Sequence, residues 1–283
     1  MKNVRDTFTL NNKNEIPCVG YGTWRTPDGD ACVSATLCAL REGYRHIDTA
    51  AYYKNERSVG IAIKESKIPR EEIFVTSKLW NTEHSYEKAI AALDASLVNL
   101  GLDYLDLYLV HWPRPISVRD CWEEANAQTW RAFEDMQKAG KIKNIGVSNF
   151  MPKHLDALLS TAKIIPAVNQ IEYHIGQITP ETVNYCRQKG ILIEAWAPLN
   201  RGLALENEEI AKIAAAHKKS TAQIHLRYCL QNGVLPLPKS VTPERIKENA
   251  DIFSFSLSDE EMKTLDLLPY LGGSGHNPDD IAF

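Results

Sequence analysis

Residues 43–60 read GYRHIDTAAYYKNERSVG, and in this stretch a strand-like run ends beside residues that can transfer protons. Asp48 stands at the end of the run RHIDT, and Tyr53 follows it five residues later. In barrels built from parallel strands, active sites form where the strands end. The stretch therefore predicts one strand of such a sheet, with functional side chains at its carboxyl end.

Strand-like and helix-like segments alternate along the rest of the chain, after an N-terminal β-hairpin predicted from DTFTL, NNKN and EIPCVG. Alternation of this kind is typical of a parallel sheet with crossover helices. Eight strand-like runs predict an α/β fold that closes into a single (β/α)8 TIM barrel. The runs centre on residues 19–24, 45–49, 73–78, 105–111, 143–148, 167–172, 191–197 and 234–239.

Capping residues mark several of the helices. Ser85 opens a helix with apolar residues at helical spacing, and Gly101 suits the left-handed cap that would end it. Ser220 and Ser258 each precede Gln or Glu by three residues, which fits a capping box. The helix predicted near 258–268 lies beyond the eight repeats, so we expect an extra C-terminal helix.

Composition is consistent with one domain spanning residues 1–283, because such barrels typically take ~250 residues. The net charge of −4 and the pI near 6.1 argue against a nucleic-acid-binding protein. No apolar run approaches the ~20 residues of a membrane span. We expect a cytoplasmic monomer.

Six cysteines and eight histidines are scattered without the spacing of a metal site. We expect no catalytic metal and no disulfide framework, with the cysteines reduced and mostly buried. An organic cofactor is then the expected partner for catalysis.

Two more strand-like runs end in titratable side chains. IFVTSK ends in Lys78, and the apolar part of YLDLYLVHW ends in His111. Any one of these residues alone has a structural alternative, such as a helix cap, a surface charge or a core histidine. Together with Asp48 and Tyr53 they predict one proton-transfer site. The Lys78 ammonium would stabilise the Tyr53 phenolate and lower a pKa that starts near ~10.

Five further strings accompany these four residues: GVSNF (146–150), NQIEYH (169–174), AWAPL (195–199), LPKS (237–240) and RIKEN (245–249). With them, the chain resembles the aldo-keto reductases, which are NADP(H)-dependent carbonyl reductases on an eight-stranded α/β barrel. It looks most like bacterial members of broad specificity, such as the 2,5-diketo-gluconate and glyoxal reductases.

The resemblance implies that aldehydes and ketones are reduced by hydride from NADPH, with Asp48, Tyr53, Lys78 and His111 as the catalytic tetrad. One alternative is a non-catalytic NADP(H)-binding regulatory or sensor protein on the same fold, which would need no proton donor. A barrel isomerase or lyase using Lys78 as a Schiff base would want that lysine desolvated and away from a carboxylate.

The resemblance also implies a set of residues that hold NADPH or NADP+. Ser148, Asn149 and Gln170 would bind the nicotinamide carboxamide, and Trp196 would stack behind the ring, where many members have Tyr. Residues 199–202 would lie near the pyrophosphate. The whole predicted set is Thr23, Asp48, Ser148, Asn149, Gln170, Trp196, Leu199, Lys239, Ser240, Thr242, Arg245 and Asn249.

The adenine end is predicted from the basic run PKSVTPERIKEN. Thr242 and Pro243 suit the first positions of a helix, whose free amides favour an anion. Lys239 and Arg245 suit a 2′-phosphate, although a basic, solvated helix start is the plain alternative. No GxGxxG motif is present, which argues against a Rossmann fold but not against a dinucleotide.

The substrate pocket is expected to be aromatic, because Trp24, Trp80 and Trp112 stand at or just after strand ends, beside His111. Packing in the core is the alternative for each tryptophan. Two segments without a clear period, residues 113–120 and the tail after Leu268, are predicted to be loops over the site. None of these features specifies one carbonyl substrate.

Overall fold

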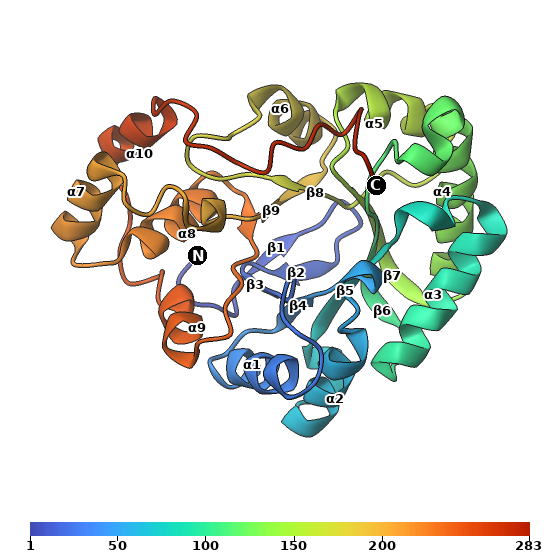
Figure 1. Ribbon diagram of the computed structural model, residues 1–283, viewed down its shortest axis with the longest axis horizontal. Coiled ribbons are helices and arrows are strands. Elements are labelled where there is room, and N and C mark those ends of the chain that lie inside the picture. The colour runs from blue at the N-terminus through green and yellow to red at the C-terminus, as the bar shows by residue number, and fades with distance from the viewer.

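The computed structural model describes residues 1–283, and its centre is a barrel of parallel strands surrounded by helices (Figure 1). The eight strands hydrogen-bond in chain order, from β3 round to β10, as predicted. They are β3 (Gly20–Gly22), β4 (His46–Asp48), β5 (Phe74–Leu79), β6 (Leu105–Val110), β7 (Ile142–Ser148), β8 (Val168–Glu172), β9 (Leu192–Trp196) and β10 (Leu235–Pro236).

Ten helices surround the strands, and two of them, α7 and α8, follow the single strand β9. They are α1 (Asp30–Arg41), α2 (Glu56–Ser66), α3 (Tyr86–Leu100), α4 (Trp122–Lys138), α5 (Pro152–Leu159), α6 (Pro180–Gln188), α7 (Glu208–His217), α8 (Thr221–Gln231), α9 (Pro243–Ala250) and α10 (Asp259–Asp266). Short 3-10 turns are η1 (Ala51–Tyr53), η2 (Arg70–Glu72), η3 (Asn81–Glu83), η4 (Ile116–Cys121) and η5 (Asn200–Gly202). The predicted loop at 113–120 therefore contains a 3-10 turn, whereas the tail after Leu268 has no regular structure.

The barrel closes between its first and last strands at one point. The backbone N–H of Gly22 donates to the carbonyl of Pro238 over 3.0 Å. The strands come close here because Gly20 has no side chain: a Cβ at that position would lie 2.4 Å from Leu237. Beyond the strands, the Tyr21 hydroxyl donates to the carbonyl of Ser240 over 2.6 Å. We call this junction the seam.

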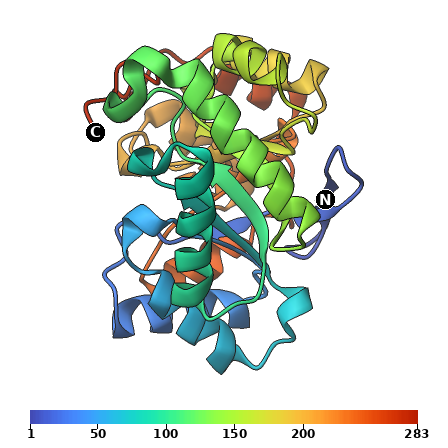
Figure 2. The same ribbon diagram turned by 90° about the vertical axis from the view of Figure 1, so that its right-hand side faces the viewer.

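The predicted N-terminal hairpin, β1 (Thr7–Thr9) and β2 (Glu15–Pro17), covers the amino ends of the barrel strands. Ile16 is fully buried against an apolar cluster that includes Phe74 and Leu107 from inside the barrel. Figure 2 shows the hairpin and the C-terminus at opposite sides of the molecule. The hairpin therefore plugs one end, and the other end is left for the site.

The predicted helix caps are confirmed. The Ser85 hydroxyl accepts from the backbone of α3, and Gly101 ends that helix with φ of 65°. Ser220 and Ser258 form capping boxes at α8 and α10, so the extra C-terminal helix is present. Thr242 and Pro243 do begin α9, but the Thr242 side chain makes no capping hydrogen bond.

Apolar residues from strands and helices form one continuous core between the two layers. All six cysteines are free thiols, and Cys121 is the exposed one. None of the helices has the length and apolar character needed to traverse a lipid bilayer.

Candidate active site

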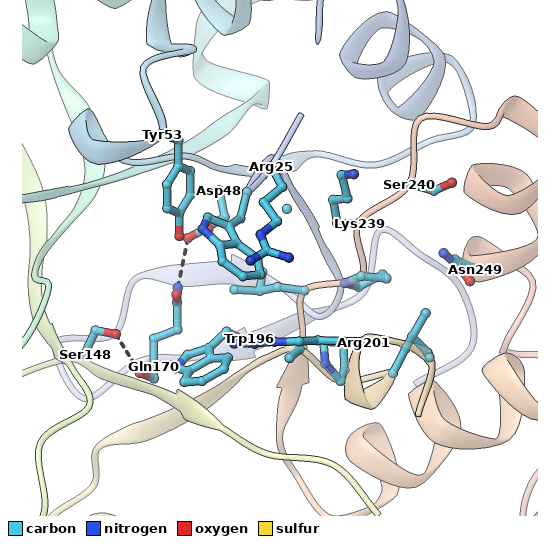
Figure 3. Close-up of a pocket in the computed structure, with 18 of the residues that line it drawn as sticks. Arg25, Asp48, Tyr53, Ser148, Gln170, Trp196, Arg201, Lys239, Ser240 and Asn249 are labelled. Carbon is cyan, nitrogen blue, oxygen red and sulfur yellow. Dashed lines mark hydrogen bonds between the residues drawn. The ribbon is translucent and has the colours of Figure 1, made fainter. Parts of the chain in front are cut away.

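A cavity of about 810 Å³ opens at the carboxyl ends of the strands (Figure 3). Figure 3 shows Tyr53, Asp48, Gln170 and Trp196 toward one end, and Ser240 and Asn249 at the other. The cavity is thus long, with a titratable end inside the barrel mouth and a polar, basic end over the seam.

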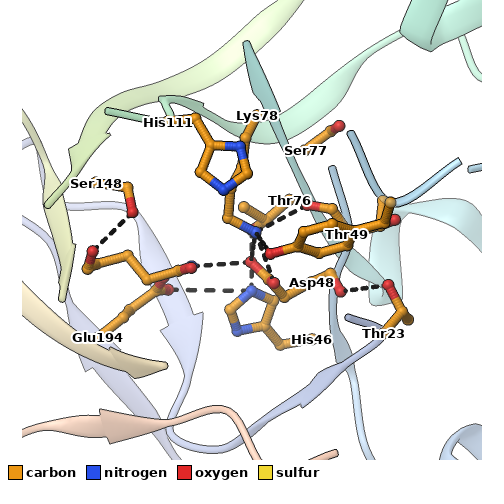
Figure 4. A network of polar contacts seen from close by, with 12 residues as sticks. Thr23, His46, Asp48, Thr49, Thr76, Ser77, Lys78, His111, Ser148 and Glu194 are labelled. Atoms are coloured by element: carbon orange, nitrogen blue, oxygen red, sulfur yellow. Dashed lines mark hydrogen bonds and ion pairs between the residues drawn. The ribbon is translucent and has the colours of Figure 1, made fainter. Parts of the chain in front are cut away.

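The Lys78 ammonium joins the titratable residues (Figure 4). Lys78 is fully buried near the end of β5, and its Nζ donates to both carboxylate oxygens of Asp48, at 2.7 and 2.8 Å. The same atom donates to the Thr49 carbonyl over 2.9 Å and to the Tyr53 hydroxyl over 3.3 Å. The structure therefore brings the predicted Asp48, Lys78 and Tyr53 together, with the ammonium holding the phenol.

Burial changes the acid–base balance of this group. Burial raises the pKa of Tyr53 above its usual 10, and the neighbouring Lys78 ammonium only partly lowers it again. The expectation that Lys78 lowers this pKa below the free value is therefore wrong, because desolvation is the larger effect. Burial alone would lower the pKa of Lys78, but Asp48 and Tyr53 raise it, so the ammonium keeps its charge.

His111 lies directly after β6, and its ring is 5.9 Å from the Tyr53 ring between centroids. Burial, together with Lys78, holds the pKa of His111 well below 6.5, so its imidazole is neutral. The Nδ1 atom is buried without a partner. A neutral imidazole here can hydrogen-bond an oxygen without competing with Lys78 for a proton.

The predicted carboxamide-binding residues lie on adjacent strands. Asn149 has a left-handed backbone, with φ of 65°, and its amide nitrogen donates to the His111 carbonyl over 2.9 Å. Its amide oxygen accepts from the Trp196 indole N–H over 2.8 Å. Ser148 donates its hydroxyl to the Gln170 carbonyl over 2.8 Å. Trp196 therefore lines the cavity and is also held by a hydrogen bond to one of the predicted carboxamide-binding residues, Asn149.

Most of the residues predicted for the adenine end line the cavity too. Lys239, Ser240, Arg245 and Asn249 line it near the seam, and Leu199 lines it as well. Burial and the nearby Arg25 lower the pKa of Lys239. An anion seated here would relieve that unfavourable charge.

Two residues of the predicted cofactor set lie outside the lining. Thr23 is fully buried, and its hydroxyl donates to the Asp48 carbonyl over 3.0 Å, so it supports the strand end. The Thr242 backbone N–H donates to the Ser240 hydroxyl over 3.1 Å. Their proposed contacts with a cofactor remain predictions.

Two arginines were missing from the predicted set, although Arg201 fell within the residues assigned to the pyrophosphate. Arg25 lies 4.4 Å above the Trp24 ring, and Arg201 lies 5.0 Å from it. Both have left-handed backbones, with φ of 57° and 52°. Arg25 could have been noticed from its position directly after a strand-end tryptophan.

The three predicted tryptophans all line the cavity, and aromatic residues from other segments join them. Tyr52 stacks on Trp80 with ring centroids 3.7 Å apart. The Phe283 ring lies nearly parallel to the Trp80 ring, with centroids 5.9 Å apart. It meets the Trp112 ring edge-on, with centroids 5.7 Å apart. These contacts form an aromatic wall beside Tyr53 and His111.

The tail after Leu268 is held across the site by polar contacts. Glu172, at the end of β8, accepts from the Ser274 backbone over 2.7 Å. Asp279 pairs with Lys153 over 2.6 Å, and Asn81 donates to the Phe283 carbonyl over 3.0 Å. The tail is therefore the element that brings Phe283 to the cavity.

Comparison with known proteins indicates the family. Residues 18–268 match the model of the aldo/keto reductase family. The glyoxal reductase of Bacillus subtilis (strain 168) is 48% identical over 280 residues, covering 99% of each chain.

Solved structures are similar over nearly the whole chain as well. An aldo-keto reductase from a deep-sea metagenome library is 44% identical with a TM-score of 0.92, covering 98% of this chain and 100% of the other. A Bombyx mori aldo-keto reductase in complex with NADP is 35% identical with a TM-score of 0.87, covering 98% and 95%. The chain thus belongs to the aldo/keto reductase family.

Proposed function

We propose that Tyr53, Lys78, Asp48 and His111 carry out the NADPH-dependent reduction of aldehydes and ketones to alcohols. The observation that carries this assignment is the contact of a buried ammonium with both a phenol and a carboxylate at the cavity's inner end. A protein that only bound or sensed the cofactor would not need that proton donor. A Schiff-base lysine is also disfavoured, because the Lys78 ammonium keeps its charge beside Asp48.

The chemistry that NADPH would supply when bound is hydride donation to the carbonyl carbon, which would leave alkoxide character on the carbonyl oxygen. Tyr53 donates its hydroxyl proton to that oxygen, and the neutral His111 imidazole hydrogen-bonds it. Lys78 stabilises the phenolate that Tyr53 becomes, and Asp48 holds the ammonium in place. In the oxidation direction, Tyr53 as phenolate accepts the proton.

The lining residues fit the chemistry of NADPH. Gln170 donates its amide nitrogen to two carboxyl groups, which leaves its amide oxygen to accept from a carboxamide. Trp196 offers a flat indole, and Lys239 and Arg245 offer charge for a 2′-phosphate. Arg25 and Arg201 extend the positive charge between the two ends, where a pyrophosphate would lie.

Small aldehydes are the proposed substrate class, and the aromatic wall supports it. Trp80 lies 5.3 Å from the His111 ring between centroids, and Phe283 lies nearly parallel to Trp80, so both rings border the cavity on the side of the tetrad. The glyoxal reductase named above adds a dicarbonyl to the compounds worth assaying first. We propose further that the chain acts as a single-domain cytoplasmic monomer, which its free thiols and continuous core support.

A carbonyl panel assayed by loss of NADPH absorbance tests the reaction, and Tyr53→Phe tests the assignment. The variant deletes only the transferable proton, so it should bind NADPH as the wild type does and lose ~10² to 10⁴ in turnover. Near wild-type turnover, under conditions where hydride transfer limits the rate, would show that Tyr53 is not the acid.

A further inference from the structure

A carboxyl group lies inside the barrel, next to the tetrad but outside the mechanism proposed above. Glu194, in the middle of β9, is fully buried. One of its carboxyl oxygens accepts from the Gln170 amide nitrogen over 2.8 Å, and the other has no hydrogen-bond partner. A buried carboxylate with a single neutral hydrogen bond is costly unless it takes up a proton.

No cation is placed to neutralise this carboxyl directly (Figure 4). The titratable groups around it are His46 and Asp48 from β4 and Lys78 from β5. His46 lies 4.0 Å away, but burial lowers its pKa to about 3, so it is uncharged. The paired residues of β8 and β10, Gln170 and Leu235, do not titrate.

The remaining charges set the affinity of Glu194 for its proton. The Lys78 ammonium is already bonded to Asp48. Burial, followed by the Asp48 carboxylate, raises the pKa of Glu194 to about 8. The buried group of Lys78, Asp48 and Glu194 is therefore neutral when Glu194 is protonated, and it carries one negative charge when Glu194 is ionised.

Gln170 connects this charge to the cavity. Its amide nitrogen is shared between Glu194 and Asp48, at 2.8 Å from an oxygen of each. Gln170 itself lines the cavity, at the end proposed for the nicotinamide. Only the Gln170 side chain therefore separates the charge of Glu194 from the proposed position of the nicotinamide.

We propose that Glu194 is a positioning residue that acts through Gln170 and whose proton is linked to the redox state of the cofactor. The nicotinamide ring carries a positive charge in NADP+ and none in NADPH. Glu194 keeps its proton beside the neutral ring and loses it more readily beside the cationic one, because opposite charges favour the ionised form. Linkage is reciprocal, so ionised Glu194 must strengthen the binding of NADP+ relative to NADPH. This inference rests on the proposed placement of the nicotinamide beside Gln170.

The ratio of the two dissociation constants, measured from pH 6 to pH 9, tests the proposal. The 2′-phosphate is common to both cofactors, so its titration cancels in the ratio. We expect Kd for NADP+ divided by Kd for NADPH to fall roughly tenfold as the pH rises, since one unit of pKa difference corresponds to tenfold in affinity. Glu194→Gln mimics the protonated carboxyl, and its ratio should not change with pH.

Tyr53→Phe separates Glu194 from the other acid near the ring. If the ratio of dissociation constants still depends on pH in this variant, Tyr53 does not cause that dependence. If the dependence on pH disappears in this variant, the proposal is wrong. An unchanged pH dependence in Glu194→Gln would overturn it as well. Failure of wild-type protein to bind either cofactor would instead refute the proposed function. Binding of both with a constant ratio would refute only the role of Glu194.

Proton release by the wild-type protein gives a second measurement that needs no variant. Titration calorimetry at pH 8 in two buffers of different ionisation enthalpy counts the protons exchanged on binding. NADP+ should release more protons than NADPH does under the same conditions. Equal proton counts for the two cofactors would overturn the proposal.

Discussion

The indole N–H of Trp196 donates to the side-chain oxygen of Asn149 over 2.8 Å, and the same amide donates to the carbonyl of His111 over 2.9 Å. One asparagine therefore links the proposed stacking surface to the residue beside the substrate oxygen. A phenol in place of the indole would carry its donor at a different position, so this bond is a consequence of having Trp196.

Trp196→Phe should weaken NADPH binding by about two- to tenfold, because it keeps an aromatic face but removes a hydrogen bond worth ~0.5 to 1.5 kcal/mol. Calorimetric titration measures the affinity without relying on tryptophan fluorescence. Trp122→Phe is the matched control, since Trp122 does not line the cavity. Unchanged affinity in Trp196→Phe would mean that the bond does not support cofactor binding.

Arg245→Ala should weaken NADPH roughly tenfold and leave NADH nearly unchanged, because only NADPH has a 2′-phosphate to pair with the guanidinium. Arg245 is exposed at the cavity edge, so solvent keeps the effect moderate. Lys247→Ala, an exposed cation in the same helix that lies outside the cavity lining, is the control. An equal loss for both cofactors would indicate a structural role for Arg245.

Reduction and oxidation should depend on pH in opposite directions. Burial holds the pKa of Tyr53 above 10 despite Lys78, so the phenol stays protonated through neutral pH. Reduction, which needs the phenol, should be level there and fall only at high pH, whereas oxidation, which needs phenolate, should rise with pH. If the rates of reduction and oxidation both rise with pH, Tyr53 is not the group that transfers the proton.

Lys78→Met should move the oxidation profile to higher pH. The substitution removes the charge that partly lowers the pKa of Tyr53, so less phenolate forms at any given pH. Profiles of kcat/KM against pH measure the change, with chemistry limiting. Lys64→Met, at an exposed position of α2, is the control. If the oxidation profile of Lys78→Met is as unchanged as that of the control, Lys78 does not stabilise the Tyr53 phenolate.

Gly60→Ala should lower the free energy of unfolding by up to ~2 kcal/mol. Alanine in a helix is worth ~1 kcal/mol over glycine, but a Cβ at position 60 would lie 2.1 Å from the carbonyl oxygen of Leu100. That neighbour is backbone of α3, so the two helices must separate, and overpacking of this kind costs ~1 to 3 kcal/mol. Urea denaturation measures the loss, with Lys64→Ala as the control. A higher midpoint for Gly60→Ala would show that the helices adjust freely.

The sequence was sufficient for features that depend on local pattern. Asp48, Lys78 and His111 could be found because each ends an apolar, strand-like run, and parallel strands bring their ends to one face. The caps at Ser85 and Ser258 could be found because a capping box is a local hydrogen-bonded motif.

Features that depend on distant contacts or on charge balance could not be found in this way. Phe283 reaches Trp80 only because Ser274 and Asp279 of the tail are tied to Glu172 and His154, by contacts across more than 100 residues of chain. The pKa of Tyr53 depends on how completely its surroundings exclude water, which a sequence does not state. Glu194 did leave a trace, as the one charged residue within the apolar run ILIEAWA.

The position of the seam between Gly22 and Pro238 means that a bound cofactor would stabilise the closed barrel. Gly22, Leu237, Pro238 and Lys239 all line the cavity, so a molecule bound beside them would touch both β3 and the segment that directly follows β10. Only one backbone hydrogen bond joins β3 to that segment, and a bound dinucleotide would add further contacts across the junction. Opening of the barrel at this edge would then require release of the ligand. The amide hydrogen of Gly22 should therefore exchange with solvent more slowly when NADPH is bound, although it lies far along the chain from Arg245 and Asn249.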